Sequence, residues 1–236
     1  TTLHEAGHSF YEMGHPVKEH GTPLGQHISL GIHESQSRFW ETRIGRSRGF
    51  WKFFLPKLQK RFKKDLGTVK LDEFMARLNH VKPSFIRTDA DEVTYPLHVI
   101  LRFEIEKELV SGKLAVKDLP KRWNEGMKDL LGITPKTDVQ GCLQDIHWSM
   151  GAFGYFPTYS LGNVYAAQMF EVFAKKHPTW EKRLEKGEFG FIHEWLSDNV
   201  WQHGRRYDGA ELIRKISGKP LTAKPFIAYL QEKYAK

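Results

Sequence analysis

The sequence predicts a mainly α-helical protein with a single domain, and three observations support this prediction. Apolar residues recur mostly at spacings of three and four residues, which is the period of an amphipathic helix. No repeat, low-complexity tract or Ser/Gly-rich linker divides the 236-residue chain. A hydrophobic fraction of 40% is enough to form one sizeable core at this length. We therefore expect one domain that spans residues 1–236.

Helix boundaries follow from the points where glycine and proline interrupt the period. The first helix is expected to run from Thr1 to Met13 and to stop at Gly14. Proline lacks a backbone N–H, so Pro56 is expected to break the chain before a basic helix that ends near Gly67. Further helices are expected at residues 32–43, 71–79, 91–111, 119–131, 163–176, 189–203, 209–216 and 224–235.

Two stretches lack helical periodicity. Residues 83–88 are expected to form a short strand or an extended segment, which would be a small β element in the fold. This segment leads into the long helix at residues 91–111, which Pro96 is expected to kink or to start late. The segment from Gly141 to Gly162 is dense in glycine and aromatic residues and is expected to be irregular.

The composition excludes several functional classes. No apolar run approaches the ~18–20 residues needed to span a bilayer, so no membrane partner is expected. The formal net charge is +8, but the densest basic stretch, residues 57–64, has the spacing of a solvated helix face, and no nucleic-acid-binding motif accompanies it. The single cysteine, Cys142, and the lack of a signal-like first segment favour a cytoplasmic protein. The sequence opens at Thr1 rather than Met, so we expect the natural start to lie upstream.

The strongest chemical motif stands at the start of the sequence. His4-Glu5-Ala6-Gly7-His8 matches the H-E-x-x-H pattern, and a spacing of four residues on a helix places both imidazoles on one face, where they can bind one Zn²⁺. Glu5 lies beside this pair and is the natural general base for hydrolysis. Taken alone, the pattern also fits a surface pair or a hydrogen-bonded core pair of histidines.

A third metal ligand is expected from the next helix. The loop between His4 and Glu34 is long enough to bring the second helix back alongside the first. His4, His8 and Glu34 then form the His₂Glu set of catalytic zinc sites, with one position left for water or substrate. His33 is the less favoured alternative ligand, and Glu34 could also be an ordinary surface carboxylate. Three further histidines are expected to line the site or to lie exposed: His15, His20 and His27.

Four motifs in this order resemble the zinc carboxypeptidases named after thermostable carboxypeptidase Taq. They are HEAGH at residues 4–8, HESQ at 33–36, IRTDAD at 86–91 and GCLQDIHW at 141–148. The resemblance covers essentially the whole sequence. A D-x-R-x-T motif, and the long N-terminal half that carries it in family members, would precede HEAGH. We therefore expect the C-terminal catalytic half of the family fold. The chain would be a piece of a longer protein, a polypeptide whose other half is supplied by a separate chain, or a degenerate product that keeps the site but not full activity.

The resemblance implies a helical, zincin-like metallopeptidase of the gluzincin type, with a small β element near a deep active-site groove and often a homodimer. It implies that His4, His8 and Glu34 bind Zn²⁺ or another divalent metal such as Co²⁺. Glu5 would be the general base and acid of an enzyme that removes amino acids from the free C-termini of peptides. The alternatives are an oligopeptidase or dipeptidyl carboxypeptidase with the same zinc chemistry, or an inactive fragment that binds peptides or zinc.

Later motifs supply candidates for stabilising an oxyanion and for binding a carboxylate. His147 and Tyr159, with Tyr155 next, can donate hydrogen bonds to a developing oxyanion, although such rings also pack groove walls without a catalytic role. Arg87 is the first choice for the substrate carboxylate, because a planar guanidinium pairs with it through two hydrogen bonds. Asp145 is a candidate acceptor for the second N–H of a metal-binding imidazole.

Overall fold

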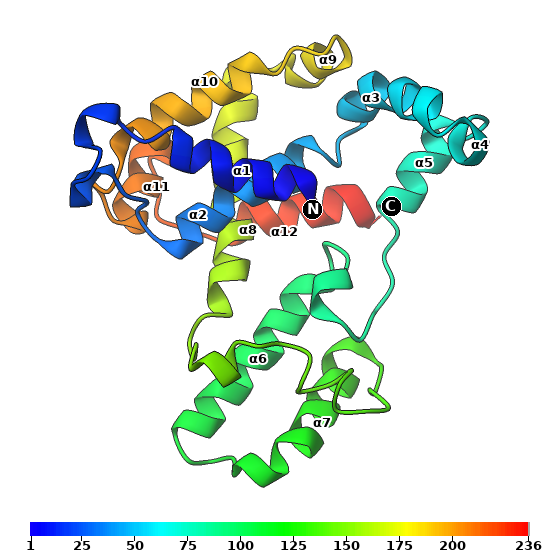
Figure 1. Ribbon diagram of the computed structural model, residues 1–236, viewed down its shortest axis with the longest axis vertical. Coiled ribbons are helices and arrows are strands. Elements are labelled where there is room, and N and C mark those ends of the chain that lie inside the picture. Colours follow the sequence, from blue (N-terminus) through cyan, green and yellow to red (C-terminus); the bar gives the residue numbers. More distant parts are fainter. Residues whose placement is uncertain (236) are drawn as a thin grey trace. The chain divides into compact units, whose positions relative to one another are not determined.

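Helices dominate the computed structural model, which describes residues 1–235 (Figure 1). The chain divides into two compact units. Unit 1 comprises Thr1–Leu78 and the chain from Leu161 onward, and unit 2 comprises Asn79–Ser160. The mainly α-helical fold class is thus confirmed, whereas the expectation of one catalytic domain over residues 1–236 stays a prediction. No helix of the described residues combines the length and apolarity needed to cross a bilayer.

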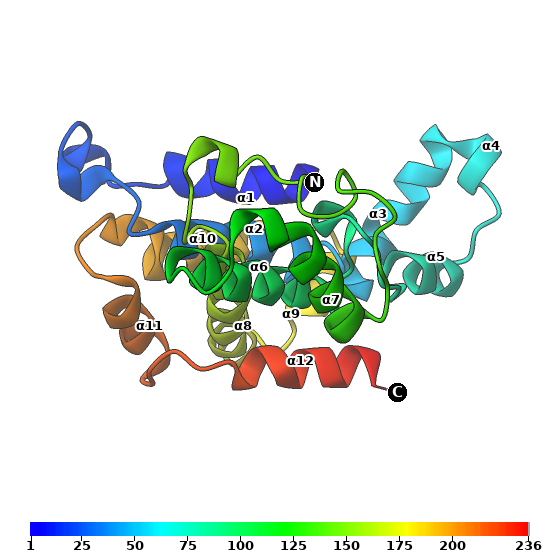
Figure 2. The ribbon, with the colours of Figure 1, turned by 90° about the horizontal axis from the view of Figure 1, so that it is seen from below.

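Unit 1 contains both motifs that are expected to supply metal ligands. Its helices are α1 (Thr2–Met13), α2 (Leu30–Arg38), α3 (Arg48–Arg61), α4 (Lys63–Leu66), α5 (Leu71–Leu78), α8 (Pro157–Lys176, whose first turn belongs to unit 2), α9 (Trp180–Glu185), α10 (Gly190–Asn199), α11 (Gly209–Ser217) and α12 (Lys224–Tyr234). A π-helical turn, Phe39–Ile44, continues α2 without a break. Helices α1 and α2 lie alongside each other in both views (Figures 1 and 2).

An aromatic core fixes α2 within unit 1. Phe39 of the π-helical turn and Phe173 of α8 are fully buried, and their ring centroids lie 5.6 Å apart. Trp195 of α10 packs edge-on against Phe173 at 5.5 Å. Burying a phenylalanine side chain contributes roughly 1.5–3 kcal/mol. The core therefore holds rigidly the helix that carries HESQ.

Unit 2 is organised around two packed helices, α6 (Tyr95–Val110) and α7 (Leu119–Leu131). Leu101 and Ile105 of α6 pack with Trp123 and Met127 of α7 in one buried cluster. Unit 2 also contains the short 3₁₀ turns Arg87–Asp89, Val116–Asp118 (just before α7) and Trp148–Met150.

The small β element is the part of the predicted fold class that is wrong, because residues 1–235 contain no strand. In the segment expected to be extended, a side chain takes the place of a neighbouring strand. Gln144 donates a hydrogen bond to the Phe85 carbonyl (3.0 Å) and accepts one from the Arg87 backbone N–H (2.8 Å). Once a single amide side chain satisfies these backbone groups, the segment does not need a strand partner.

Several helix boundaries also differ from the expectation. Pro56 lies inside α3 rather than at a break; its ring is exposed, so the helix loses one backbone hydrogen bond but keeps the packing of the residues around it. Helix α8 begins at Pro157, before the expected Asn163, because proline is well tolerated in a first turn. The late start of the long helix, with Pro96 in its first turn, and the helix Leu119–Leu131 are confirmed.

A buried histidine makes the stability of unit 2 depend on pH. His98 on α6 is fully buried, and burial together with the nearby charges of Arg102 and Arg87 lowers its pKa to about 4. Between pH 6.5 and 4 the unfolded chain therefore binds a proton that the folded chain excludes, so stability is lost as the pH falls through this window. The loss should be on the order of 3 kcal/mol.

Urea unfolding of the wild type and of His98→Leu at pH 7 and pH 4.5 tests this expectation. The wild type should lose more free energy of unfolding than the variant on acidification. A matched control is His80→Leu, because His80 is exposed. Equal pH dependence in the wild type and His98→Leu would contradict the assignment.

Candidate metal centre

The three expected ligands converge within unit 1. His4 and His8 lie one turn apart on α1, and Glu34 lies on α2. The Nε2 atoms of the two histidines are 3.2 Å apart. Oε2 of Glu34 lies 3.6 Å from Nε2 of His4 and 3.4 Å from Nε2 of His8.

These separations fit a tetrahedral zinc ion. Ligand atoms that each lie ~2.0–2.1 Å from zinc at tetrahedral angles are roughly 3.3 Å from one another. A triangle with sides of 3.2, 3.4 and 3.6 Å has a centre about 2.0 Å from each corner. One point at zinc-binding distance from all three atoms therefore exists, and a fourth coordination position remains for water or substrate.

Two glycines allow this close packing. A Cβ atom on Gly7 would lie 2.6 Å from the backbone oxygen of Gln36 and from Cα of Ser37, so α1 approaches α2 this closely only where the side chain is absent. A Cβ on Gly162 of α8 would lie 2.3 Å from Cγ of Glu34. Packing against α2 thus explains why a glycine stands at position 7, within HEAGH, and the lack of a side chain at Gly162 leaves room for the Glu34 side chain.

Glu34 is held as a carboxylate. It is 4% exposed, its Oε1 accepts a hydrogen bond from Nε of Arg38 at 2.9 Å, and Ser37 donates to Oε2 at 3.2 Å. Burial by itself raises the pKa of Glu34, but the hydrogen bond with His8 and the charge of Arg38 outweigh it, and the pKa lies below its ordinary value. The ionised form is the one that binds a cation.

His4 has a carboxylate behind it. Its Nδ1 lies 2.9 Å from Oε2 of Glu41, and Arg38 donates to the same oxygen at 3.0 Å. Burial opposes ionisation of Glu41, yet the hydrogen bond with His4 and the charge of Arg38 lower its pKa to about 2. A carboxylate that accepts Nδ1–H keeps the Nε2 lone pair directed at the metal. The sequence reasoning missed Glu41, although it follows Glu34 by two helical turns.

His8 has a second imidazole behind it. Its Nδ1 lies 2.5 Å from Nδ1 of His33, whose Nε2 lies 2.8 Å from Oε1 of Glu12. His33, the alternative ligand in the sequence analysis, thus faces the far side of His8. His27 and His15 also approach the Glu12 carboxylate, with their Nδ1 atoms at 3.3 and 3.7 Å.

Glu5 is exposed on α1, directly after His4. Its position on the ligand helix is compatible with the expected role as general base, which stays a prediction.

The candidate oxyanion donors lie together in unit 2. Nε2 of His147 lies 2.9 Å from the hydroxyl of Tyr159, and the ring of Tyr155 lies 5.3 Å from that of His147. Their proximity shows a common cluster, and their catalytic roles stay predictions.

Arg87 is buried in the same unit and has internal partners. Its Nε and Nη2 donate to Oδ1 of Asp145 at 3.1 and 2.8 Å, and Nη1 donates to the hydroxyl of Tyr95 at 3.1 Å. Oδ2 of Asp145 accepts from Nε of Arg102 at 2.7 Å. Asp145 thus joins two guanidinium groups, whereas His4 finds its carboxylate in Glu41. The expected binding of a substrate carboxylate by Arg87 stays a prediction.

The sequence reasoning also missed two buried polar residues. Arg102 is fully buried on α6 and donates to the His98 carbonyl and to Gln144, each at 2.8 Å. Gln36, the last residue of HESQ, accepts a hydrogen bond from the Trp201 indole at 2.9 Å. A charged residue within the apolar pattern of the long helix was the available signal for Arg102.

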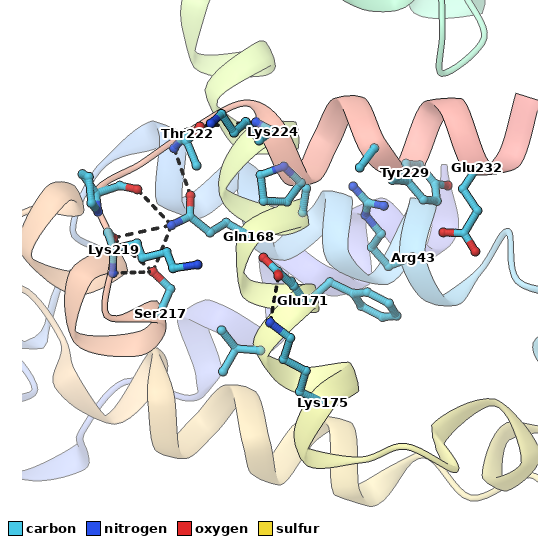
Figure 3. A pocket seen from close by; sticks show the side chains of 16 residues that line it. Arg43, Gln168, Glu171, Lys175, Ser217, Lys219, Thr222, Lys224, Tyr229 and Glu232 are labelled. Carbon is cyan, nitrogen blue, oxygen red and sulfur yellow. Dashed lines mark hydrogen bonds and ion pairs between the residues drawn. The ribbon is translucent and has the colours of Figure 1, made fainter. Parts of the chain in front are cut away.

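A separate pocket of about 760 Å³ in unit 1 lies between α8 and the C-terminal segment (Figure 3). Its polar groups are largely used to join these elements. Gln168 donates to Ser217 and to the Pro220 carbonyl, and Arg43 stacks on the Tyr229 ring at 3.4 Å. This pocket therefore lacks the convergent ligand atoms of the centre at α1 and α2.

Comparison with known proteins identifies related sequences. The model of the carboxypeptidase Taq (M32) metallopeptidase family matches residues 1–234. Carboxypeptidase 1 of Bacillus subtilis is 45% identical and thermostable carboxypeptidase 1 of Thermus thermophilus 47% identical, each over 234 residues. The alignments cover 99% of this chain but 47% and 46% of the relatives, so the chain spans about half their length.

Solved structures agree with the sequence comparison. The M32 carboxypeptidase from Deinococcus radiodurans R1 matches with a TM-score of 0.96 at 46% identity, and a Pyrococcus furiosus carboxypeptidase with 0.95 at 42%. Each match covers 99% of this chain and 47% of the other chain.

Substituting Gly7 tests the packing that creates the centre. Gly7→Ala should push α1 away from α2, weaken zinc binding by at least about tenfold and cost roughly 1–3 kcal/mol of stability. Zinc affinity from competition with a chromophoric chelator and urea unfolding measure the two effects. Gly190→Ala is the matched control, because a Cβ there meets no atom within 4 Å. Equal zinc affinity in both variants would contradict this explanation.

Proposed function

The chain belongs to the carboxypeptidase Taq (M32) metallopeptidase family, and we propose that it carries the metal centre of a zinc-dependent metallocarboxypeptidase acting on the C-terminal peptide bond of peptides. The convergence of His4, His8 and Glu34 at tetrahedral spacing is the observation that carries this proposal. Two imidazoles and one carboxylate are the ligand set of catalytic zinc, whereas structural zinc is usually enclosed by cysteines.

The proposed chemistry divides between the cation and the chain. A divalent cation bound here, Zn²⁺ or another such as Co²⁺, would polarise the scissile carbonyl and lower the pKa of a water molecule. Glu5 accepts the proton of the attacking water and returns it to the departing amine. Glu41 keeps the His4 proton on Nδ1, so that the Nε2 lone pair is available for the cation.

Four further residues are the proposed substrate contacts. His147 and Tyr159, with Tyr155 next, donate hydrogen bonds to the oxyanion. Arg87 binds the free α-carboxylate. Peptides with a free C-terminus are therefore the proposed substrates. The homodimer remains an expectation from the resemblance, and the cytoplasmic location remains an expectation from the sequence.

Glu5→Gln separates catalysis from metal binding. Because the amide does not accept a proton, hydrolysis should fall by about 10²–10⁴-fold while the zinc content stays the same. Release of the C-terminal amino acid, followed by chromatography, and zinc content by elemental analysis are the measurements. Glu125→Gln on α7 is an exposed control that should leave both unchanged.

The terminal carboxylate requirement is tested with paired peptides. A peptide with a free C-terminus should be cleaved, and its amidated counterpart should be cleaved at least about 100-fold more slowly, because the charge-assisted pair with Arg87 is lost. Efficient cleavage of the amidated peptide would instead favour an oligopeptidase.

A further inference from the structure

Two side chains, His33 and Glu12, connect the proposed metal ligand His8 to the surface of unit 1. We propose that Glu12, acting through His33, fixes the tautomer of His8 and thereby its capacity to bind the cation. Nδ1 of His8 meets Nδ1 of His33, and Nε2 of His33 meets Oε1 of Glu12 at 2.8 Å. This inference rests on the proposed metal centre and adds two positioning residues to it.

The two histidine ligands differ in what stands behind them. Nδ1 of His4 faces the Glu41 carboxylate, which is ionised and only accepts a hydrogen bond. Nδ1 of His8 faces an imidazole nitrogen, which donates or accepts according to the tautomer. His4 is therefore held in the correct tautomer by its direct neighbour, whereas the tautomer of His8 depends on a residue further out.

Only one arrangement of protons leaves His8 able to bind metal. With its Nε2 lone pair on the cation, neutral His8 carries its proton on Nδ1 and donates it to Nδ1 of His33. Neutral His33 then carries its own proton on Nε2, where Glu12 accepts it. In the reverse arrangement, Nδ1–H of His33 donates to His8, and the proton of His8 moves to Nε2, where it blocks the ligand position.

Glu12 selects the productive arrangement because a carboxylate stabilises an N–H and repels a lone pair. In the reverse arrangement, the bare Nε2 of His33 would face Oε1 at 2.8 Å without a proton between them. Glu12 follows His8 by one turn on α1, so the same helix that supplies the ligand supplies the residue that sets its tautomer.

The hydrogen-bonded line from Glu12 through His33 to His8, called the relay below, requires a fixed orientation of the His33 ring. His33 precedes Glu34 on α2, and the fully buried ring of Tyr11 lies edge-on to it at 5.3 Å. The Tyr11 hydroxyl accepts a hydrogen bond from the Ile28 backbone N–H at 3.2 Å, which holds the Tyr11 ring in place.

The same atoms allow a competing explanation, a second cation site, and the experiment has to distinguish it from the relay. Ligand atoms of Glu12, His27 and His33 lie within 4.8 Å of one another and could hold a second cation. A relay requires Glu12 and His33 but not His27, whereas a second cation site requires all three.

Metal affinity measures the relay without depending on peptidase activity. Co²⁺ and Zn²⁺ are titrated against a chromophoric chelator for the wild type, Glu12→Ala, Glu12→Gln, His33→Ala and His27→Ala. The wild type should bind one ion per chain. Glu12→Ala and His33→Ala should bind it about 10–100-fold more weakly, which is the usual effect of losing such an outer partner. Glu12→Gln, whose amide can donate as well as accept, no longer selects one tautomer and should bind the ion with an affinity between those of the wild type and Glu12→Ala, and His27→Ala should stay within about twofold of the wild type.

Any other result contradicts the inference. Some results would also contradict the proposed metal centre. Failure of the wild type to bind either ion would remove the proposed metal centre as well. One tightly bound ion in every variant would remove only the relay. Glu12→Gln as tight as the wild type would show that the carboxylate does not select the tautomer. Two ions in the wild type and one in His27→Ala would establish a second cation site instead. Because Glu12 is half exposed, Glu12→Ala should fold, and thermal unfolding of the metal-free variants checks this.

Discussion

The contact between α1 and α2 at Gly7 is the constraint on which the proposed metal centre depends. Two helices that carry ordinary side chains at the contact keep their axes about 8–10 Å apart. Here a Cβ on Gly7 would already lie 2.6 Å from the facing backbone. This approach brings Glu34 to within 3.6 Å of both His4 and His8, and it also brings their outer partners into reach. The five residues HEAGH therefore supply two of the proposed ligands, and Gly7 leaves the space for the third.

The second structural requirement is that charged groups near the centre remain paired. Arg38 donates hydrogen bonds to both Glu34 and Glu41, so two carboxylates of the same helical segment share the positive charge of one guanidinium. Removing one member of a buried charge network costs about 3–5 kcal/mol, because its partner is left unpaired. Hydrogen bonds with His8 and His4, together with the charge of Arg38, keep the two carboxylates ionised, one as the proposed metal ligand and the other to orient His4.

The sequence was sufficient for some parts of this account and insufficient for others, for physical reasons. His4 and His8 are predictable because their geometry lies within a single helix, and the helical fold follows from the apolar period. Glu41 was missed because its spacing of two turns after Glu34 is also that of an ordinary solvated carboxylate, and nothing in the local pattern shows that it faces His4 on another helix. The strand at residues 83–88 was wrong because Gln144, distant in sequence, satisfies its backbone groups. Side-chain partners from other elements leave no local pattern.

X-ray absorption at the zinc edge of the zinc-loaded chain tests the central claim most directly, because it reports the ligand atoms around the ion. The account predicts one zinc per chain with two imidazole nitrogens at about 2.0–2.1 Å and carboxylate or water oxygens at about 2.0–2.2 Å, and it predicts that Glu34→Ala removes an oxygen ligand. A sulfur neighbour near about 2.3 Å, or a first shell without two imidazoles, would contradict the claim that His4, His8 and Glu34 hold the metal.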